Sequence, residues 1–447
     1  MTTMIWLPLL TACLQPPPQG PTPAARALQI HEPFSAETKR SLVGFSLLVE
    51  GGAASDHPGK EGAGALMWSA LSTHPALQKW EEAGGQFRSE WHRDYGALHY
   101  RWSASKDLDG ILTRVIEEQF SVDENEMDWE NALEATRNSW NRSENDRGLP
   151  DLRDAWLASG LEGHPYAHPK RGTSRTRATL TVSDLRTSFE DNLCTSRIHT
   201  AWSTQESSGG LPEGIAIALN ALGPCGKELP TPKPLPYLNQ EQLLILETRG
   251  AGTQAFVALA HRGTSRPFDA NVLQWAAALL EGPSDNGPIN RHLNRAEIEA
   301  SVTARIAPRG ERWRQPLLQV ELRTQEADPV TLLSTLRKTL QRLPQDGWSP
   351  RDVHRLKKHL AHQPGSSSTS PRLESLLLGE AFGPSPTLDP NLESEAILEV
   401  LSRGIALDAP LIVMEVGDSE ELAAYAESQG ISTRILKAEE VEMEPTD

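Results

Sequence analysis

One segment near the N-terminus constrains the fold more than any other, because it joins a strand directly to a closely packed helix. Ser41 to Gly51 is an apolar run typical of a buried strand. Gly62 to Thr73 is a second apolar run, and its start carries Gly62 and Gly64, which let a backbone approach its neighbours closely. The segment therefore predicts mixed α and β structure with a tightly packed helix.

The stretch from Lys60 to Leu71 resembles the zinc-binding helix of the pitrilysin family, the M16 or insulinase-like metallopeptidases. That family carries H-x-x-E-H, in which two His bind Zn²⁺ and the Glu activates the metal-bound water. In the same frame this chain has Ala65, Trp68 and Ser69, none of which supplies a zinc ligand or a base. The resemblance implies a protease fold without its chemistry, with no zinc and no other cofactor. Trp68, a bulky residue where the Glu would stand, indicates a position that is filled and not merely emptied.

A second segment, from His164 to Trp202, also resembles this family. The residues in register with the family pattern are His164, Pro165, Tyr166, Gly172, Leu180, Asp184, Leu185 and Phe189. Family chains of this length are α+β proteins with two homologous halves, each a mainly antiparallel sheet backed by helices. The resemblance therefore implies a pitrilysin-like domain at 33–228, a Pro-rich linker at 229–240 and a second pitrilysin-like domain at 241–436.

Periodicity predicts further elements along both halves. An alternating, aromatic stretch at 85–102 predicts a hairpin. One apolar face at 106–120 predicts a helix, and a long polar helix follows from 125 to about 142. In the second half, the apolar pattern predicts a strand at 254–260 and a helix at 269–280.

The N-terminus has the pattern of a lipoprotein signal. An apolar run ends in Leu-Thr-Ala before Cys13, which resembles the bacterial lipobox. This predicts a signal peptide at 1–12, a lipid on Cys13 and an extended Pro-rich tether at 13–32. The chain would then be anchored in the bacterial envelope facing the periplasm, and the absence of Asp at Leu14 favours the outer membrane. A buried N-terminal helix with a chance match is the alternative.

The charge balance bears on partners. The chain has 43 Lys and Arg against 60 Asp and Glu, a net charge of −17 that is spread along the chain, and 437–447 forms an acidic tail. Because nucleic-acid affinity comes mainly from Lys and Arg on phosphates, we expect no nucleic-acid partner. The balance also weakens any interpretation in which a basic face holds an anionic membrane. The sequence contains no G-x-S-x-G and no P-loop.

The family also uses a third zinc ligand and a substrate-binding Arg and Tyr, and these align less well with this sequence. The resemblance places a third zinc ligand on the long helix near 131–138, where Glu134 is the nearest carboxylate, but without the two His it would not hold zinc. Active members also use an Arg and a Tyr that steady the substrate carbonyl. Arg291 and Arg295 lie close to the Arg position and are candidates to face substrate, whereas Ala300 falls at the Tyr position.

Two smaller groups of residues remain. Cys194 and Cys225 lie in the same predicted domain, so they are candidates for a disulfide, and two unpaired buried cysteines are the alternative. In the predicted hairpin, His92 and Asp94 share a face by the period of two, while His99 is out of phase. Neither group carries a functional prediction.

Together these features predict a catalytically inactive M16-like peptidase homologue. The leading hypothesis is a non-catalytic subunit that partners a zinc-bearing subunit of the same family in periplasmic peptide degradation or processing. Its surface would select unfolded or small peptides by size and by strand pairing to a sheet edge. The alternative is an envelope binding or assembly protein without a protease partner, comparable to the core subunits of the respiratory cytochrome bc complex. An active enzyme with relocated ligands is a third hypothesis.

Overall fold

The structure is a computed structural model of the chain. It describes residues 26–31, 42–103, 108–120, 129–147, 165–167, 169–204, 211–229, 240–248, 253–260, 267–282, 287–307, 317–324, 327–343, 350–362, 393–395, 397–398, 405 and 407–437. The predicted signal peptide, Cys13, most of the predicted linker and the acidic tail beyond 437 lie outside the described residues. Among the helices that are described, none is long and apolar enough to cross a membrane.

The first half is built on a five-stranded sheet of order β1-β5-β2-β4-β3. Only β1 and β5 run parallel, and the other three pairings are antiparallel. The strands are β1 (Arg26–His31), β2 (Leu42–Glu50), β3 (Gln86–Trp91), β4 (Tyr95–Ser103) and β5 (Ile198–Thr204).

Strand β1 corrects one predicted boundary, because it lies inside the segment assigned to the tether at 13–32. Arg26 to His31 pairs in parallel register with His199 to Thr204. This strand has six residues, and its partner β5 comes much later in the chain. The local sequence therefore does not distinguish the strand from an extended tether. The tether prediction is therefore too long at its C-terminal end.

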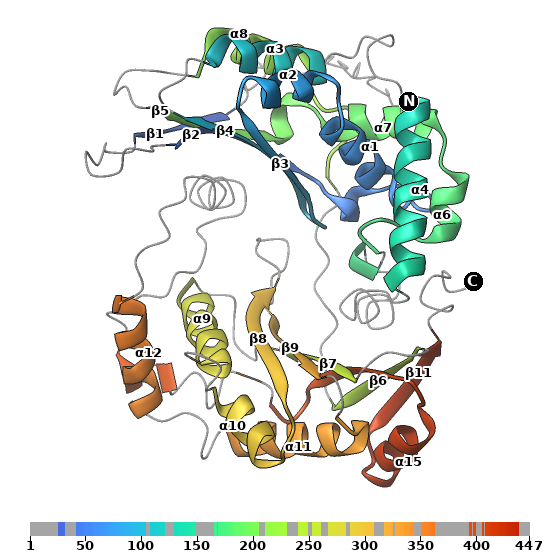
Figure 1. The fold of residues 1–447 in the computed structure, drawn as a ribbon, viewed down its shortest axis with the longest axis vertical. Coiled ribbons are helices and arrows are strands. Elements are labelled where there is room, and N and C mark those ends of the chain that lie inside the picture. The colour runs from blue at the N-terminus through green and yellow to red at the C-terminus, as the bar shows by residue number, and fades with distance from the viewer. Residues whose placement is uncertain are drawn as a thin grey trace, which may run out of the picture.

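Helices cover one face of this sheet (Figure 1). The strand residues on that face include Phe45, Leu47, Tyr100 and Trp202, all 5% exposed or less. The helices are α1 (Ala63–Ser72), α2 (Ala76–Glu82), α3 (Asp109–Phe120), α4 (Trp129–Arg147), α6 (Ser174–Thr179), α7 (Val182–Asn192) and α8 (Glu213–Ala221), with 3₁₀ turns η1 (Ala53–Ser55), η2 (Pro165–Ala167) and η3 (Thr195–Arg197).

The second half has a six-stranded sheet of order β11-β6-β10-β7-β9-β8. Its strands are β6 (Gln242–Glu247), β7 (Gln254–Ala260), β8 (Ala300–Ala307), β9 (Leu317–Thr324), β10 (Leu411–Val416) and β11 (Ser432–Lys437). Its helices are α9 (Pro267–Glu281), α10 (Pro288–Arg295), α11 (Pro329–Arg342), α12 (Pro350–His362) and α15 (Glu420–Ser428).

The two sheets share one topology. Strands β6 to β10 repeat the order of β1 to β5, and each pairing has the same direction as its counterpart in the first sheet. Strand β11 extends the second sheet beside β6. In Figure 1 the sheets face each other and α2, α3, α10 and α11 lie on the outer sides. The predicted α+β fold of two homologous halves is confirmed.

Local sequence explains where several helices begin. Thr173 and Thr181 start α6 and α7 with capping boxes, in which each Thr side chain accepts a hydrogen bond from the third helical N–H. Asp328 caps α11, and Pro329 follows at the first helical position. The predicted hairpin, the helix at 269–280 and the helix at 62–73 all appear within a few residues of their predicted bounds.

Candidate functional site

The candidate site lies where α1 leaves the loop after β2. The Asp56 carboxylate accepts hydrogen bonds from the backbone N–H of Gly62 at 2.7 Å and of Gly64 at 3.0 Å, so it satisfies the otherwise open N-terminus of α1. Burial, with a smaller contribution from the nearby Glu61, raises the pKa of Asp56 to about 7 despite the lowering effect of the two hydrogen bonds. Gly62 has a φ of 95°, which favours glycine. The helix start is thus held by one carboxyl group of raised pKa.

The three degenerate motif positions pack into the domain interior. Ala65 is 4% exposed, Trp68 is 2% exposed and Ser69 is half-buried. The Trp68 ring lies 5.3 Å, centroid to centroid, from the Trp91 ring at the end of β3. This distance falls in the range of favourable aromatic pairs. An aromatic pair therefore fills the position that the sequence resemblance aligns with the family's catalytic Glu.

Two glycines make room for this pair. A Cβ atom added at Gly96 would lie 2.8 Å from both indole rings, and one added at Gly64 would lie 2.4 Å from Trp91. Both separations are well inside van der Waals contact. Neither indole N–H has a hydrogen-bond acceptor among the described residues, so packing is what holds the two rings in place.

Helix α4 contributes the hydroxyl group of Thr136, which contacts the motif helix α1. Thr136 donates from its Oγ1 to the Ser69 Oγ at 3.3 Å, and Thr136 is 6% exposed. Glu134, the carboxylate nearest to the expected ligand position, is exposed. The α4 side chain that hydrogen-bonds Ser69 on the motif helix is therefore a threonine, not a glutamate.

These residues do not fit a zinc ion. Zinc takes thiolate, imidazole or carboxylate ligands, whereas Ala65, Trp68, Ser69 and Thr136 carry a methyl group, an indole and two neutral hydroxyls. Within the part of the chain that the structure describes, no group of three His, Cys, Asp or Glu is arranged to hold a metal. No catalytic step through zinc can be derived for this site.

The hairpin residues do not form a cluster. His92 Nε2 lies 3.0 Å from the Glu90 carboxylate, whereas Asp94 accepts a hydrogen bond from the Tyr166 hydroxyl. His99 Nδ1 lies 2.9 Å from the Ser46 hydroxyl, and burial lowers the pKa of His99 to about 4. Each group thus has a local structural partner. The predicted common face of His92 and Asp94 does not produce a shared site.

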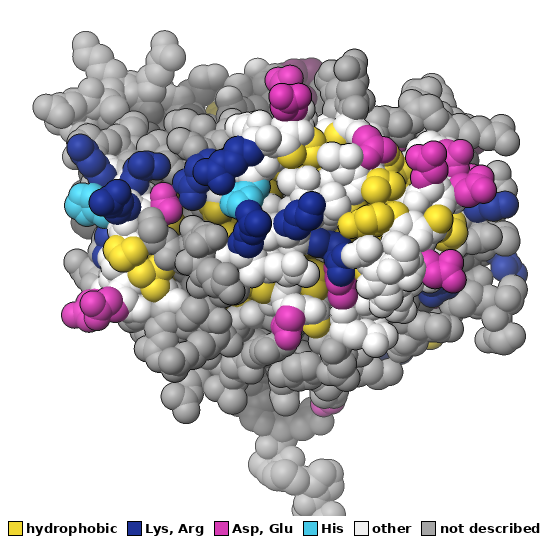
Figure 2. Space-filling model, turned by 90° about the horizontal axis from the view of Figure 1, so that it is seen from below, with side chains coloured by type: hydrophobic (Ala, Val, Ile, Leu, Met, Phe, Trp, Pro, Cys, Tyr) yellow, Lys and Arg dark blue, Asp and Glu magenta, His cyan; other side chains and the backbone are white. Residues whose placement is uncertain are grey.

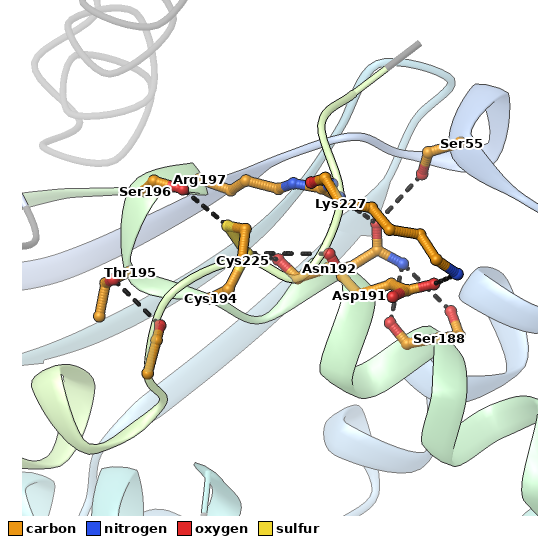
Figure 3. The surroundings of a disulfide bond; sticks show 11 residues. Ser55, Ser188, Asp191, Asn192, Cys194, Thr195, Ser196, Arg197, Cys225 and Lys227 are labelled. Atoms are coloured by element: carbon orange, nitrogen blue, oxygen red, sulfur yellow. Dashed lines mark hydrogen bonds and ion pairs between the residues drawn. A yellow bond between two sulfur atoms is a disulfide. The ribbon is translucent and has the colours of Figure 1, made fainter. Parts of the chain in front are cut away.

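Cys194 and Cys225 are joined in a disulfide, with Cα atoms 5.0 Å apart. Figure 3 shows that it connects the end of α7 to the chain that follows α8. Close by, Asp191 accepts from the Lys227 ammonium at 3.1 Å and lies 3.0 Å from His57 Nε2. The loop that leads into α1 and the segment that leads toward the linker are therefore fastened to the same helix end.

The second-half candidates are partly committed to other contacts. Arg291, on α10, makes an ion pair with both carboxylate oxygens of Asp352 on α12, at 3.3 and 3.4 Å. Arg295 is exposed in the last turn of α10, and Ala300 begins β8. Their role in facing substrate stays a prediction.

The comparisons with known proteins agree with this fold. The chain is similar to a peptidase M16 inactive domain from Pseudomonas fluorescens, with a TM-score of 0.70, 16% identity and coverage of 88% of this chain and 95% of that one. A protease from Helicobacter pylori matches with a TM-score of 0.70, 12% identity and coverage of 88% and 97%. A chain of complex III2 from Candida albicans matches with a TM-score of 0.66, 14% identity and coverage of 91% and 97%.

Pitrilysin also matches, with a TM-score of 0.63 and 13% identity, but the match spans only 44% of that chain. No family model matches the sequence, and no curated protein does. The fold of this protein is that of the M16 peptidases, as the sequence resemblance implied.

Sequence reasoning missed several residues of the site. Trp91 and Gly96 belong to the hairpin, and only the packing of that hairpin against α1 brings them to Trp68. Thr136 gave no signal because a lone Thr on a polar helix is ordinary. Asp56 lies six residues before the N-cap residue Gly62, so the N-cap rule does not identify it, and only the folded loop brings its carboxyl group to the helix start.

Proposed function

We propose that this protein is a catalytically inactive M16-fold subunit of the bacterial cell envelope that works with a zinc-bearing subunit of the same family. The observation that carries the proposal is Trp68, which is buried against Trp91 at the position that the sequence resemblance aligns with the catalytic base. An indole at this position supplies neither a metal ligand nor a general base. The likeness to an M16 domain described as inactive supports the same proposal.

The likeness to pitrilysin is compatible with a partner. The match spans 44% of that chain, and in the proposed assembly a zinc-bearing subunit would supply a second pitrilysin-like part. A subunit that has lost its metal can still supply half of the wall around a substrate. The zinc-bearing partner would supply the chemistry.

Peptide binding would use the edge of the first sheet. Strand β3 is the last strand of that sheet, and among the described strands it pairs only with β4. An exposed strand edge offers backbone N–H and C=O groups to an extended peptide. Ser72 on α1 donates to Ser89 on β3 at 2.6 Å, which fixes this edge against the degenerate helix. Unfolded or small peptides are the ligands that such an edge can accept.

The first experiment measures zinc and peptidase activity of the purified chain. We expect less than stoichiometric zinc and no hydrolysis of unstructured peptides by the chain alone. Stoichiometric zinc that a chelator removes together with activity would overturn the proposal.

A designed variant tests whether only the ligands were lost. Ala65→His, Ser69→His and Thr136→Glu together restore three ligands on α1 and α4 while Trp68 stays in place. If the backbone keeps the family geometry, this variant gains zinc that the wild type lacks, measured by calorimetric titration. The matched control carries Ala65→His and Ser69→His together with Glu134→Asp in place of the substitution at Thr136. It should gain no three-ligand zinc site, because Glu134 is exposed.

A second candidate function is an envelope assembly protein with no protease partner. The similarity to a chain of complex III2, over 97% of that chain, favours it, since the fold also occurs in that complex. Affinity capture of the tagged protein from detergent-solubilised envelopes discriminates the two functions. Recovery of a partner with intact H-x-x-E-H supports the peptidase subunit, and recovery of other proteins without it supports the assembly role.

A further inference from the structure

The outer helices of the second half carry a charge opposite to that of the whole chain. Within the bounds of α10, α11 and α12 there are nine Lys or Arg and one acidic residue, Asp352. The chain as a whole has a net charge of −17. The even distribution seen along the sequence therefore hides a local excess of positive charge.

The fold brings these three helices into one surface. Helices α10 and α12 are joined by the ion pair between Arg291 and Asp352. In Figure 2 most of the Lys and Arg side chains lie in the left half and the centre of this surface, and several Asp and Glu side chains lie toward the right. The acidic side includes exposed Glu420, Glu421 and Glu427 of α15. We name the basic part, formed by α10, α11 and α12, the basic face; its exposed cations are Arg295, Lys338, Arg342, Arg351, Arg355 and Lys358.

The basic face lacks the features of a protein interface core. Cores of protein interfaces are enriched in aromatic and aliphatic residues and depleted of Lys. Among the described residues, the exposed large hydrophobic side chains are Ile217 on α8 and Ile435 on β11, neither of which belongs to the three helices. A charged surface without apolar anchors suits an extended anionic surface such as a membrane, which attracts clustered Lys and Arg side chains.

We propose that the basic face docks the second half of the protein on an anionic phospholipid surface. The acidic remainder of the chain is repelled by the same surface, so attraction and repulsion together select one orientation. The first half, with β3 and the filled site, would then point away from the bilayer. This inference does not depend on the proposed partner subunit, because the basic face lies on the other half of the chain.

The test uses the full chain carrying Cys13→Ser, so that no lipid on that residue contributes. Its co-sedimentation is measured with vesicles of phosphatidylcholine alone and with vesicles containing about 30% phosphatidylglycerol, at low ionic strength. We expect binding to the anionic vesicles in excess of the neutral ones, and release at about 0.5 M salt, where charge interactions are screened. Equal binding to both kinds of vesicle would overturn the proposal.

A pair of matched variants places the interaction. Arg295→Gln, Lys338→Gln and Arg355→Gln remove one exposed cation from each helix of the basic face. Lys79→Gln, Arg114→Gln and Arg175→Gln remove the same charge from exposed positions of the first half. The first variant is expected to lose about tenfold or more in binding to anionic vesicles, and the second to keep it. Circular dichroism confirms that both variants are folded.

Two outcomes would refute the assignment. Equal loss in both variants would show that net charge, not the basic face, drives adsorption. Retention of double-stranded DNA at the same ionic strength, without excess binding to anionic vesicles, would show that the basic face serves a nucleic acid instead of a membrane.

Discussion

The two halves of this molecule have one topology and two different interiors. The buried cluster of the first half includes Phe45, Trp80, Tyr100, Trp102 and Trp202. The buried cluster of the second half is dominated by Leu, Ile and Val, with Trp275 as its one aromatic member among the described residues. A strand order repeated from β1–β5 to β6–β10 thus does not require similar side chains, only apolar ones at the same faces.

The difference is concentrated around the motif helix. In the first half, α1 packs against the β3–β4 hairpin through Trp68 and Trp91, and glycines provide the space. In the second half, the corresponding helix α9 carries Trp275, which is fully buried. The motif helix of the first half is therefore part of an aromatic core, while the second half is distinguished by the positive charge on α10, α11 and α12.

The largest expected effect separates the two cores. Trp68→Ala and Trp275→Ala each remove a buried indole and should cost about 3–5 kcal/mol of unfolding free energy. Because each half has its own core, each substitution should lower one unfolding transition and leave the other in place. Urea denaturation followed by near-UV circular dichroism measures this, with Trp68→Phe as the milder control. A single transition lowered equally by both substitutions would break the comparison.

The disulfide gives a smaller effect on the first half alone. Cys194→Ser should lower the free energy of unfolding by about 3 kcal/mol, because the bond closes a loop of intermediate length in the unfolded chain. The second half contains no Cys, so a reducing agent should lower only the first-half transition. Denaturation with and without dithiothreitol measures this effect. A lower midpoint of the second-half transition in the presence of dithiothreitol would contradict the prediction that the disulfide stabilises only the first half.

A pH dependence should distinguish the halves further. The native pKa of Asp56 is about 7 and its ordinary value is 3.8, so the folded protein keeps a proton that the unfolded chain has lost between these values. The stability of the first half should therefore fall as pH rises from about 4 to about 7, by at most about 1.4 kcal/mol per pH unit, and then level off. Denaturation at pH 5 and pH 8 measures it. Asp56→Asn should flatten this slope, and an unchanged slope would show that other groups cause it.

The smallest expected effect concerns the exposed carboxylate of α4. Glu134→Ala should change the free energy of unfolding by less than about 0.5 kcal/mol, since the side chain is exposed. Thr136→Ala, its buried neighbour, should cost more because it removes the contact with Ser69. Thermal unfolding of both variants compares them. A larger loss from Glu134→Ala would mean that this carboxylate has a structural role.

Much of the fold could be predicted because it depends on local patterns. The strand at Ser41–Gly51, the helix at Gly62–Thr73 and the hairpin all carry apolar patterns that indicate the element type when length and flanking glycines are considered. Strand β1 could not be found, since a short edge strand depends on a partner that comes much later in the chain. Its segment looks extended either way.

The candidate site was only half predictable for the same reason. Ala65, Trp68 and Ser69 were visible in the motif frame, and burial of Trp68 agrees with the prediction that the position is filled. Trp91 and Thr136, which complete the contacts, come from β3 and α4. No sequence spacing relates them to the motif, because their proximity depends on how three elements pack.

The sequence by itself determined what this protein lacks. Whether a side chain can hold zinc is a property of residue type. The sequence alone therefore shows that Ala65, Trp68 and Ser69 stand where the family motif has His, Glu and His. Only the tertiary structure decided what replaced them and where the charge lies. An indole pair and a basic face both depend on distant segments meeting, and a chain of net charge −17 gives no sign that α10, α11 and α12 come together. The balance of charges is a sum over the sequence, whereas a surface potential is set by position.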